Sequence, residues 1–214
     1  MSGGVFRFEM PRFFEGFMKY LEKIITLVKS GKIKTKYSHF NLIYRRRKTF
    51  IFSVDCSGLV EFWLKKKHSE ALQEIYAFVY QARQVSQKQI KRLYSFDFYD
   101  FFERGILSES LWKVVRMEEP LQRGDVIACI NEEQKGRFGH VAVVEKELYR
   151  DENVLRLQVI DSSAMEHFCD ERPSEKKGIG RGILELHLQN GAVSEICYMP
   201  ECSRTRKVLI GRLK

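Results

Sequence analysis

Cys56 is the residue whose position most clearly predicts chemistry. A short β-prone run from Phe50 to Val54 leads into it, and the apolar residues that follow fall at helical spacing. We therefore expect the thiol where a strand ends and a helix begins. The free N–H groups and the dipole of a helix N-terminus favour an anion, so this position favours thiolate over thiol. A buried, unreactive thiol is the alternative interpretation, because free cysteines are among the most buried residues.

His140 and Asp161 are the candidate partners of Cys56. A cysteine nucleophile needs a base within hydrogen-bond reach, and the base needs a third group to orient it. His140 stands near the start of one predicted strand, and Asp161 ends the next. Three apolar residues on the same face precede Asp161, and a carboxylate there is costly to bury without a partner. If the two strands form a hairpin, the pattern predicts a Cys56–His140–Asp161 triad.

The polar loop after Asp161 holds further candidates. His167 competes with Asp161 for the third catalytic place, since geometry decides between them. Together with Asp170 and Arg172 it could bind an acidic substrate, with Arg172 or Arg181 as the clamp. A solvated loop with glycine turns is the alternative. The remaining histidines are interpreted as structural or surface residues: His39, His68 and His187.

Helices are expected first along the chain and strands afterwards, which predicts an α+β domain. Helical spacing and caps indicate four helices: Pro11 to Lys29, Cys56 to about Lys67, Ser69 to about Ala82, and Ser86 to about Tyr94. Lys32 to Lys48 resembles a loop or arm, and Ser108 to Val115 a short helix or packed loop. Alternating or apolar runs indicate strands at Val126 to Ile130, Gly139 to Glu145, Val154 to Asp161, Gly182 to Leu188, Val193 to Tyr198 and Lys207 to Leu213.

The length of 214 residues fits one domain over 1–214, with an N-terminal helical extension over 1–36 and a helical insertion over 68–120. No run approaches the apolar length of a membrane span. The first residues show no basic segment followed by an apolar core, so no signal peptide and a cytoplasmic location are expected. Export by a route that reads no N-terminal signal stays open.

The formal net charge of +9 suggests an anionic partner, either nucleic acid, anionic lipid or a cell-wall polymer. No nucleic-acid module accompanies the charge, so we expect no nucleic acid and prefer a solvated basic surface, with binding to an anionic surface as the alternative. The five cysteines are an odd number in a chain too long to need disulfides, and their spacing predicts no zinc site. A monomer without a cofactor is expected.

Three short motifs together carry a resemblance to a known family. They are Asp55-Cys56-Ser57-Gly58-Leu59-Val60, Arg123-Gly124-Asp125-Val126-Ile127 and Gly139-His140-Val141-Ala142-Val143-Val144. Over residues 37–163 the chain resembles the NlpC class of papain-like cysteine peptidases, which are best known as bacterial cell-wall endopeptidases. The resemblance implies a papain-like half-fold, in which the catalytic-cysteine helix packs on an antiparallel sheet. It also implies that Cys56 is the nucleophile and His140 the base, with Asp161 in the third place.

The chain departs from the family at two points. The third residue of the family is usually His, Asn or Gln, and the common Tyr-x-x-Gly-Gly run is absent, so Tyr37 or Tyr44 would have to supply the tyrosine. The predicted function is a thiol hydrolase that cleaves an amide bond in a peptidoglycan-type peptide through a thioester. A thiol acyltransferase or amidase acting on lipid or protein, and a binding module without catalysis, are the alternatives. The predicted substrate-binding residues are Tyr37, Asp55, Ser57, His167 and Arg172.

Overall fold

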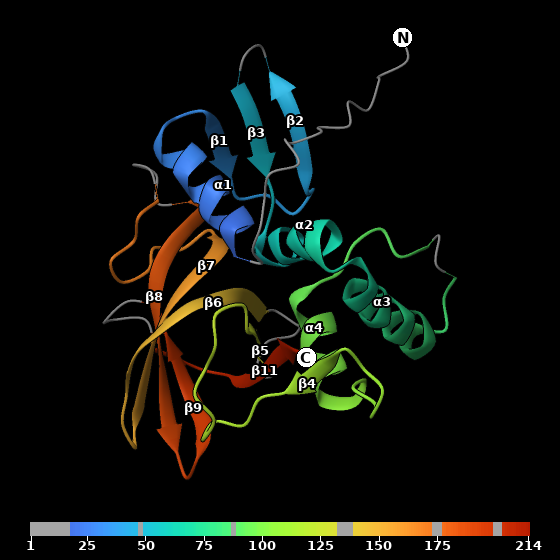
Figure 1. Cartoon of the computed structure of the whole chain (residues 1–214), viewed down its shortest axis with the longest axis vertical. Coiled ribbons are helices and arrows are strands. Elements are labelled where there is room, and N and C mark those ends of the chain that lie inside the picture. Colours follow the sequence, from blue (N-terminus) through green and yellow to red (C-terminus); the bar gives the residue numbers. More distant parts are fainter. Residues whose placement is uncertain (1–17, 47–48, 87–88, 132–138, 173–176, 199–202) are drawn as a thin grey trace.

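Four helices and two sheets make up the described part of the computed structural model, which covers residues 18–46, 49–86, 89–131, 139–172, 177–198 and 203–214 (Figure 1). This mixture confirms the predicted α+β class. The helices are α1 (Lys19–Lys29), α2 (Cys56–Lys67), α3 (Ser69–Arg83) and α4 (Ser95–Arg104). None of the helices in the described ranges is long and apolar enough to cross a bilayer.

A small sheet leads the chain into α2. Its order is β1 (Ile33–Lys36), β3 (Thr49–Ser53) and β2 (Leu42–Arg46), with β1 parallel and β2 antiparallel to β3. The expected strand before Cys56 is therefore confirmed as β3. The expectation of a loop or arm over Lys32 to Lys48 is wrong, because β1 and β2 in this segment form hydrogen bonds with β3. The local sequence is polar and does not by itself predict strands there.

A curled antiparallel sheet of eight strands forms the rest of the frame (Figure 1). The strand order is β10-β9-β8-β7-β6-β5-β11-β4. The strands are β4 (Trp112–Val114), β5 (Val126–Ile130), β6 (Gly139–Arg150), β7 (Val154–Ser163), β8 (Gly178–Gln189), β9 (Ala192–Cys197), β10 (Ser203–Thr205) and β11 (Lys207–Leu213). The six predicted strands are confirmed within a few residues, and β6 and β7 form the predicted antiparallel hairpin, in which Val143 pairs with Ile160.

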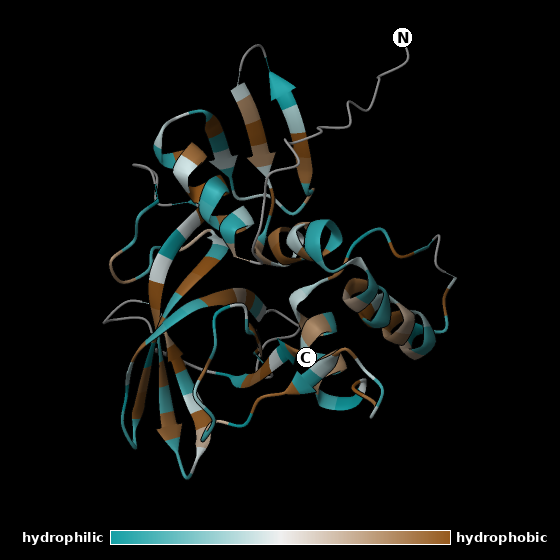
Figure 2. Ribbon diagram, in the orientation of Figure 1, coloured by the Kyte–Doolittle hydropathy of each residue, from teal (hydrophilic) through white to brown (hydrophobic). Residues whose placement is uncertain are grey.

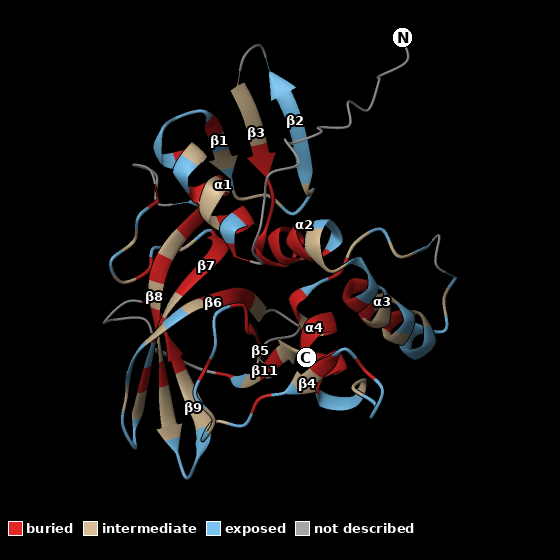
Figure 3. Ribbon diagram, viewed as in Figure 1, coloured by how far each residue is buried: buried red, intermediate tan, exposed pale blue. Residues whose placement is uncertain are grey.

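Each face of the large sheet carries its own apolar cluster, because successive side chains of a strand point to opposite faces. On one face, Val141, Val143 and Ile160 pack with residues of α1, α2 and α4. On the other, Ala142, Val144 and further sheet residues pack inside the curl. Figures 2 and 3 show the apolar and the buried stretches along the strands and along α2. The helix that bears Cys56 is thereby fixed against β6 and β7.

Two helix assignments between α3 and β5 differ from expectation. Ser86 to Tyr94 forms no α-helix in its described part; instead the Ser86 backbone and hydroxyl bind the Gln89 side chain, at 2.8 Å each. Ser108 to Val115 is neither helix nor loop throughout, since Trp112–Val114 pairs with β11 as β4. The first part of the expected Pro11 helix, residues 11–17, lies outside the described residues. Its remainder is confirmed as α1, which is followed by Gly31 at φ 71°.

Candidate active site

The start of α2 presents Cys56 with a well-defined cap. Asp55 is the N-cap, and its Oδ1 accepts a hydrogen bond of 2.8 Å from the Gly58 N–H. Ser57 is buried and donates its hydroxyl to the Leu93 carbonyl at 3.0 Å. The second oxygen of Asp55 binds Arg92 and lies 3.1 Å from His39 Nδ1. These contacts hold the first turn of α2 in one orientation.

Cys56 lies in the wall of a pocket of about 340 Å³. Tyr37, His39, Arg92 and Gly139 also line this pocket. The thiol is only 5% exposed, and the backbone N–H of Val141 bonds to its sulfur. Because Gly139 and Val141 flank His140 in sequence, β6 brings His140 to the same end of α2.

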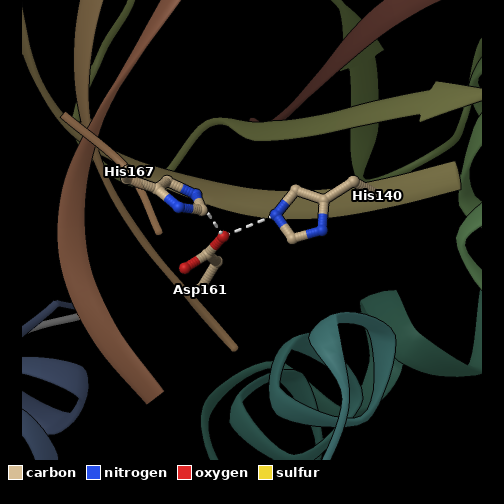
Figure 4. A group of neighbouring side chains, drawn as sticks. All are labelled: His140, Asp161 and His167. Atoms are coloured by element: carbon tan, nitrogen blue, oxygen red, sulfur yellow. Dashed lines mark hydrogen bonds and ion pairs between the residues drawn. The ribbon is translucent and has the colours of Figure 1, made fainter. Parts of the chain in front are cut away.

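Asp161 is the centre of a buried polar cluster (Figure 4). Its Oδ2 lies 2.5 Å from His140 Nε2 and 2.9 Å from His167 Nε2. The first contact is a hydrogen bond, whereas the second is close without hydrogen-bond alignment. Figure 4 shows the two rings on opposite sides of the carboxylate. The sequence leaves open whether Asp161 or His167 is the third residue of the predicted triad. In the structure, Asp161 contacts His140 directly, and His167 lies on the other side of Asp161.

Arg172 closes the cluster on the far side of Asp161. Its guanidinium binds Asp161 Oδ1, contacts Asp170 Oδ2 at 2.6 Å, and donates to the Gly178 carbonyl at 2.9 Å. The side chains of all three charged residues have no exposed surface. Two carboxylates and one guanidinium therefore meet in this buried group, and the Arg172 charge is among the causes that lower the pKa of the neighbouring His140.

Glycines of β8 make room for this cluster. A Cβ at Gly180 would lie 2.1 Å from Arg172 Cγ, and one at Gly182 would lie 2.5 Å from His167 Cβ. The run of alternating glycines from Gly178 to Gly182 therefore belongs to the strand that covers the site. The sequence pattern predicts a strand only from Gly182, with a loop before it, so the start of β8 at Gly178 differs from this expectation; the period-two spacing of small residues is the available signal.

Sequence reasoning missed Tyr198 and Arg206. The Tyr198 ring lies 5.6 Å from the His140 ring and 5.2 Å from the His167 ring, centroid to centroid. Arg206 is 9% exposed, and its Nε and Nη1 are buried with no hydrogen-bond partner. The Arg206 charge acts on His140, Cys129 and Tyr198, lowering the pKa of each. Nothing in the local sequence of either residue distinguishes it from an ordinary strand or loop residue.

The protonation states at the site differ from the expectation of a thiolate. Burial raises the pKa of the Cys56 thiol to about 12, and the Asp55 charge adds to this, while the N–H groups of Val141 and Ser57 lower it. The pKa of His140 is lowered well below its usual value by burial first, and then by the charges around it. Burial therefore has a larger effect on the pKa of Cys56 than the helix N-terminus has. At rest, Cys56 is a neutral thiol and His140 a neutral imidazole.

The other predicted substrate-binding residues are divided between two places. Tyr37, Asp55 and Ser57 line the Cys56 pocket, whereas the side chains of His167 and Arg172 are fully buried behind Asp161. Arg181, the other candidate clamp, is held by Glu145 and Glu171. Tyr44 is exposed on β2. Of the two candidate tyrosines, Tyr37 is therefore the one at the pocket, and its pKa is raised by burial.

Two described clusters contain enough ligand types for a metal ion. In the first, the nitrogens of His140 and His167 both lie close to one Asp161 oxygen, and the Arg172 cation contacts the other oxygen. In the second, His187 faces Cys197 with Nε2 at 3.7 Å and Glu195 with Nδ1 at 4.0 Å. In each group, one ligand atom from every residue lies within 4.8 Å of the others, although the Arg172 cation against Asp161 disfavours an ion in the first.

Comparisons with protein-family models, with curated proteins and with solved structures give no match to this chain. The functional argument therefore depends on the geometry of the site itself.

Proposed function

We propose that the protein is a thiol hydrolase that cleaves an amide bond, with Cys56 as the nucleophile. The main support for this proposal is the set of contacts made by His140 and its two neighbours in sequence. Its Nε2 is bound to Asp161, and its backbone neighbours Gly139 and Val141 lie at the Cys56 thiol. The remaining nitrogen, Nδ1, is then the atom that can accept the proton of Cys56.

The reaction begins from the neutral pair. As the Cys56 sulfur attacks the amide carbonyl, its proton moves to Nδ1 of His140, and the imidazolium is stabilised by the Asp161 carboxylate. His140 then gives this proton to the leaving amine, so that a thioester remains. A water molecule, deprotonated by His140, attacks the thioester and releases the acid and the free thiol.

The oxyanion formed in both steps needs donors. Cys56 is the first residue of α2, so its N–H has no intrahelical acceptor and is free to serve. The Tyr37 hydroxyl, at the same pocket, is the proposed second donor. Arg92, anchored on Asp55, would hold a carboxylate of the substrate at the pocket wall.

The proposed substrate is a peptidoglycan-type peptide, because the motifs around Cys56 and His140 resemble those of NlpC-type peptidases. The fold proposed with it is the papain-like half-fold, supported by a cysteine-bearing helix packed on an antiparallel sheet. A basic surface beside the pocket also favours a second candidate, acyl transfer to or from a lipid. The two candidate reactions differ in the molecule that takes the acyl group from the thioester: water in hydrolysis, and a second substrate in acyl transfer.

Purified wild type incubated with cell-wall peptides, followed by mass spectrometry of the products, tests the proposal. We expect hydrolysis that falls by at least about a thousandfold in Cys56→Ala, because a nucleophile normally carries several powers of ten. Cys169→Ser, which changes an exposed thiol, is the matched control and should keep wild-type activity. Residual activity in Cys56→Ala within about tenfold of wild type would rule out the assignment.

A further inference from the structure

The β2 surface is an unusual concentration of exposed apolar side chains. We define it as Phe40, Leu42, Ile43, Tyr44, Arg45 and Arg46. Its apolar members are 84%, 57%, 36% and 47% exposed in chain order. They are four of the ten large apolar side chains that are exposed in the described ranges, and they fall within five consecutive positions. Single exposed apolar residues are ordinary, but a contiguous group indicates a binding surface.

Both faces of β2 are open to solvent. All five residues of the strand are exposed, as Figure 3 shows along its whole length. Since side chains alternate, Leu42 and Tyr44 point to one face and Ile43 to the other. β2 is also an edge strand that pairs only with β3. A protein partner laid on one face, or a peptide strand added to the edge, would leave apolar side chains on the other face in water.

Positive charge surrounds the apolar residues. Arg45 and Arg46 continue the strand, and Figure 2 shows this hydrophilic tip beyond the apolar half of β2. A groove of about 380 Å³ beside Phe40 and Ile43 is also lined by Lys65 and Lys91. A second copy of the chain would bring these like charges together at the contact, which disfavours self-association.

We propose that the β2 surface docks on an anionic lipid bilayer. Apolar side chains that enter the interface, flanked by Arg and Lys that meet the headgroups, are the combination that holds peripheral proteins at such membranes. A bilayer interface surrounds an inserted strand and so covers both faces of β2 at once. His39 and Arg92 line both the β2 groove and the Cys56 pocket, so docking places the pocket near the membrane. This inference does not depend on the proposed hydrolysis.

Sedimentation of the full chain with vesicles tests the inference. Vesicles of about three parts phosphatidylcholine to one part phosphatidylserine are compared with pure phosphatidylcholine, at low and at high salt. We expect binding to the anionic vesicles only, weakened by salt. Phe40→Ser/Leu42→Ser and Arg45→Glu/Arg46→Glu should each weaken binding by at least about tenfold.

Matched variants change exposed residues of the same kinds elsewhere on the chain. Leu148→Ser/Tyr149→Ser removes two exposed apolar side chains of β6, and Lys146→Glu/Lys207→Glu reverses two charges of the large sheet. Both should bind vesicles more tightly than the β2 variants. The inference is overturned if wild type does not bind anionic vesicles, or if the control variants lose as much binding as the β2 variants. Light scattering that shows a dimer abolished by the β2 changes, without vesicle binding, would assign the surface to a second copy instead.

Discussion

The Asp161 carboxylate meets His140 at Nε2, 2.5 Å away. This contact fixes the orientation of the His140 ring. Because Nε2 is bonded to Asp161, only Nδ1 can bond to another group. Asp161 itself is fully buried and is held by Arg172, so the orienting group is as rigid as the strand that carries it. Because the pKa of Cys56 is raised and that of His140 is lowered, the resting thiol and imidazole beside this contact are both neutral.

The ion pair between Asp161 and Arg172 predicts a large stability effect. Asp161→Asn removes the charge that Arg172 needs and leaves the buried guanidinium with Asp170 alone. We expect the free energy of unfolding to fall by about 3 kcal/mol, as for other buried pairs that lose one partner. Denaturant unfolding followed by circular dichroism measures the change.

The exposed Asp151→Asn is the control and should unfold close to the wild-type midpoint, because the Asn oxygen can still accept the turn N–H groups of Asn153 and Val154. The double variant Asp161→Asn/Arg172→Met should recover part of the loss, since no uncompensated guanidinium then remains. If Asp161→Asn is as stable as Asp151→Asn, the cluster does not contain the ion pair described here.

The two buried histidines predict loss of stability in acid. The pKa values of His140 and His167 are both lowered in the folded protein, while an unfolded histidine titrates near about 6.5. Below that pH the unfolded state binds more protons than the folded state. The free energy of unfolding therefore falls as the pH drops from about 6.5 towards the lowered pKa values, by about 1.4 kcal/mol per pH unit for each imidazole.

Unfolding midpoints measured between about pH 7 and pH 5 test this slope. His167→Gln removes one of the two imidazoles and should flatten the slope; His187→Gln, at a half-buried position outside the cluster, is the control. Equal slopes in wild type and His167→Gln would contradict the assignment of a neutral, buried His167.

How far the sequence predicts this site depends on the distance in sequence between the contacting groups. The start of α2 at Cys56 and the β6–β7 hairpin follow from local spacing, and the structure confirms them. Arg172 and Arg206 reach the site only through the β7–β8 pairing and the last strands, so local patterns place them in loops. The thiolate expectation failed for a related reason, since the helix start is visible in sequence but the burial of Cys56 is not.

Arg206 offers a test of the electrostatic argument at His140. Its charge lowers the pKa of His140, so Arg206→Met, which keeps the aliphatic part of the side chain, should raise that pKa. The ring resonances of His140 followed by NMR through a pH titration report the change. Arg212→Met, whose arginine instead pairs with Asp125, is the control. A His140 pKa that is the same in Arg206→Met and wild type would show that Arg206 does not act on His140.

Asp55 predicts a change in the thiol itself. Its charge raises the pKa of Cys56, so Asp55→Asn should lower that pKa, while asparagine still caps the helix. We expect faster alkylation of Cys56 at alkaline pH in Asp55→Asn/His140→Ala than in His140→Ala alone. Asp55→Ala should in addition lose about 1 kcal/mol of stability, because the cap is gone. Slower alkylation in the double variant would contradict the assigned effect of Asp55.

The pH dependence of Cys56 alkylation by iodoacetamide, in wild type and His140→Ala, tests the central claim most directly. The peptide bearing Cys56 is quantified by mass spectrometry over about pH 5 to 9, with the exposed Cys169 as the internal standard. If His140 is the base, wild-type Cys56 reacts at neutral pH and remains reactive below about pH 6.5, because the pKa of His140 is lowered. His140→Ala should react at least about tenfold more slowly at neutral pH and recover only towards alkaline pH, since the pKa of Cys56 is raised to about 12. Equal rates in wild type and His140→Ala at every pH would show that His140 does not activate Cys56, and the proposed hydrolase would be wrong.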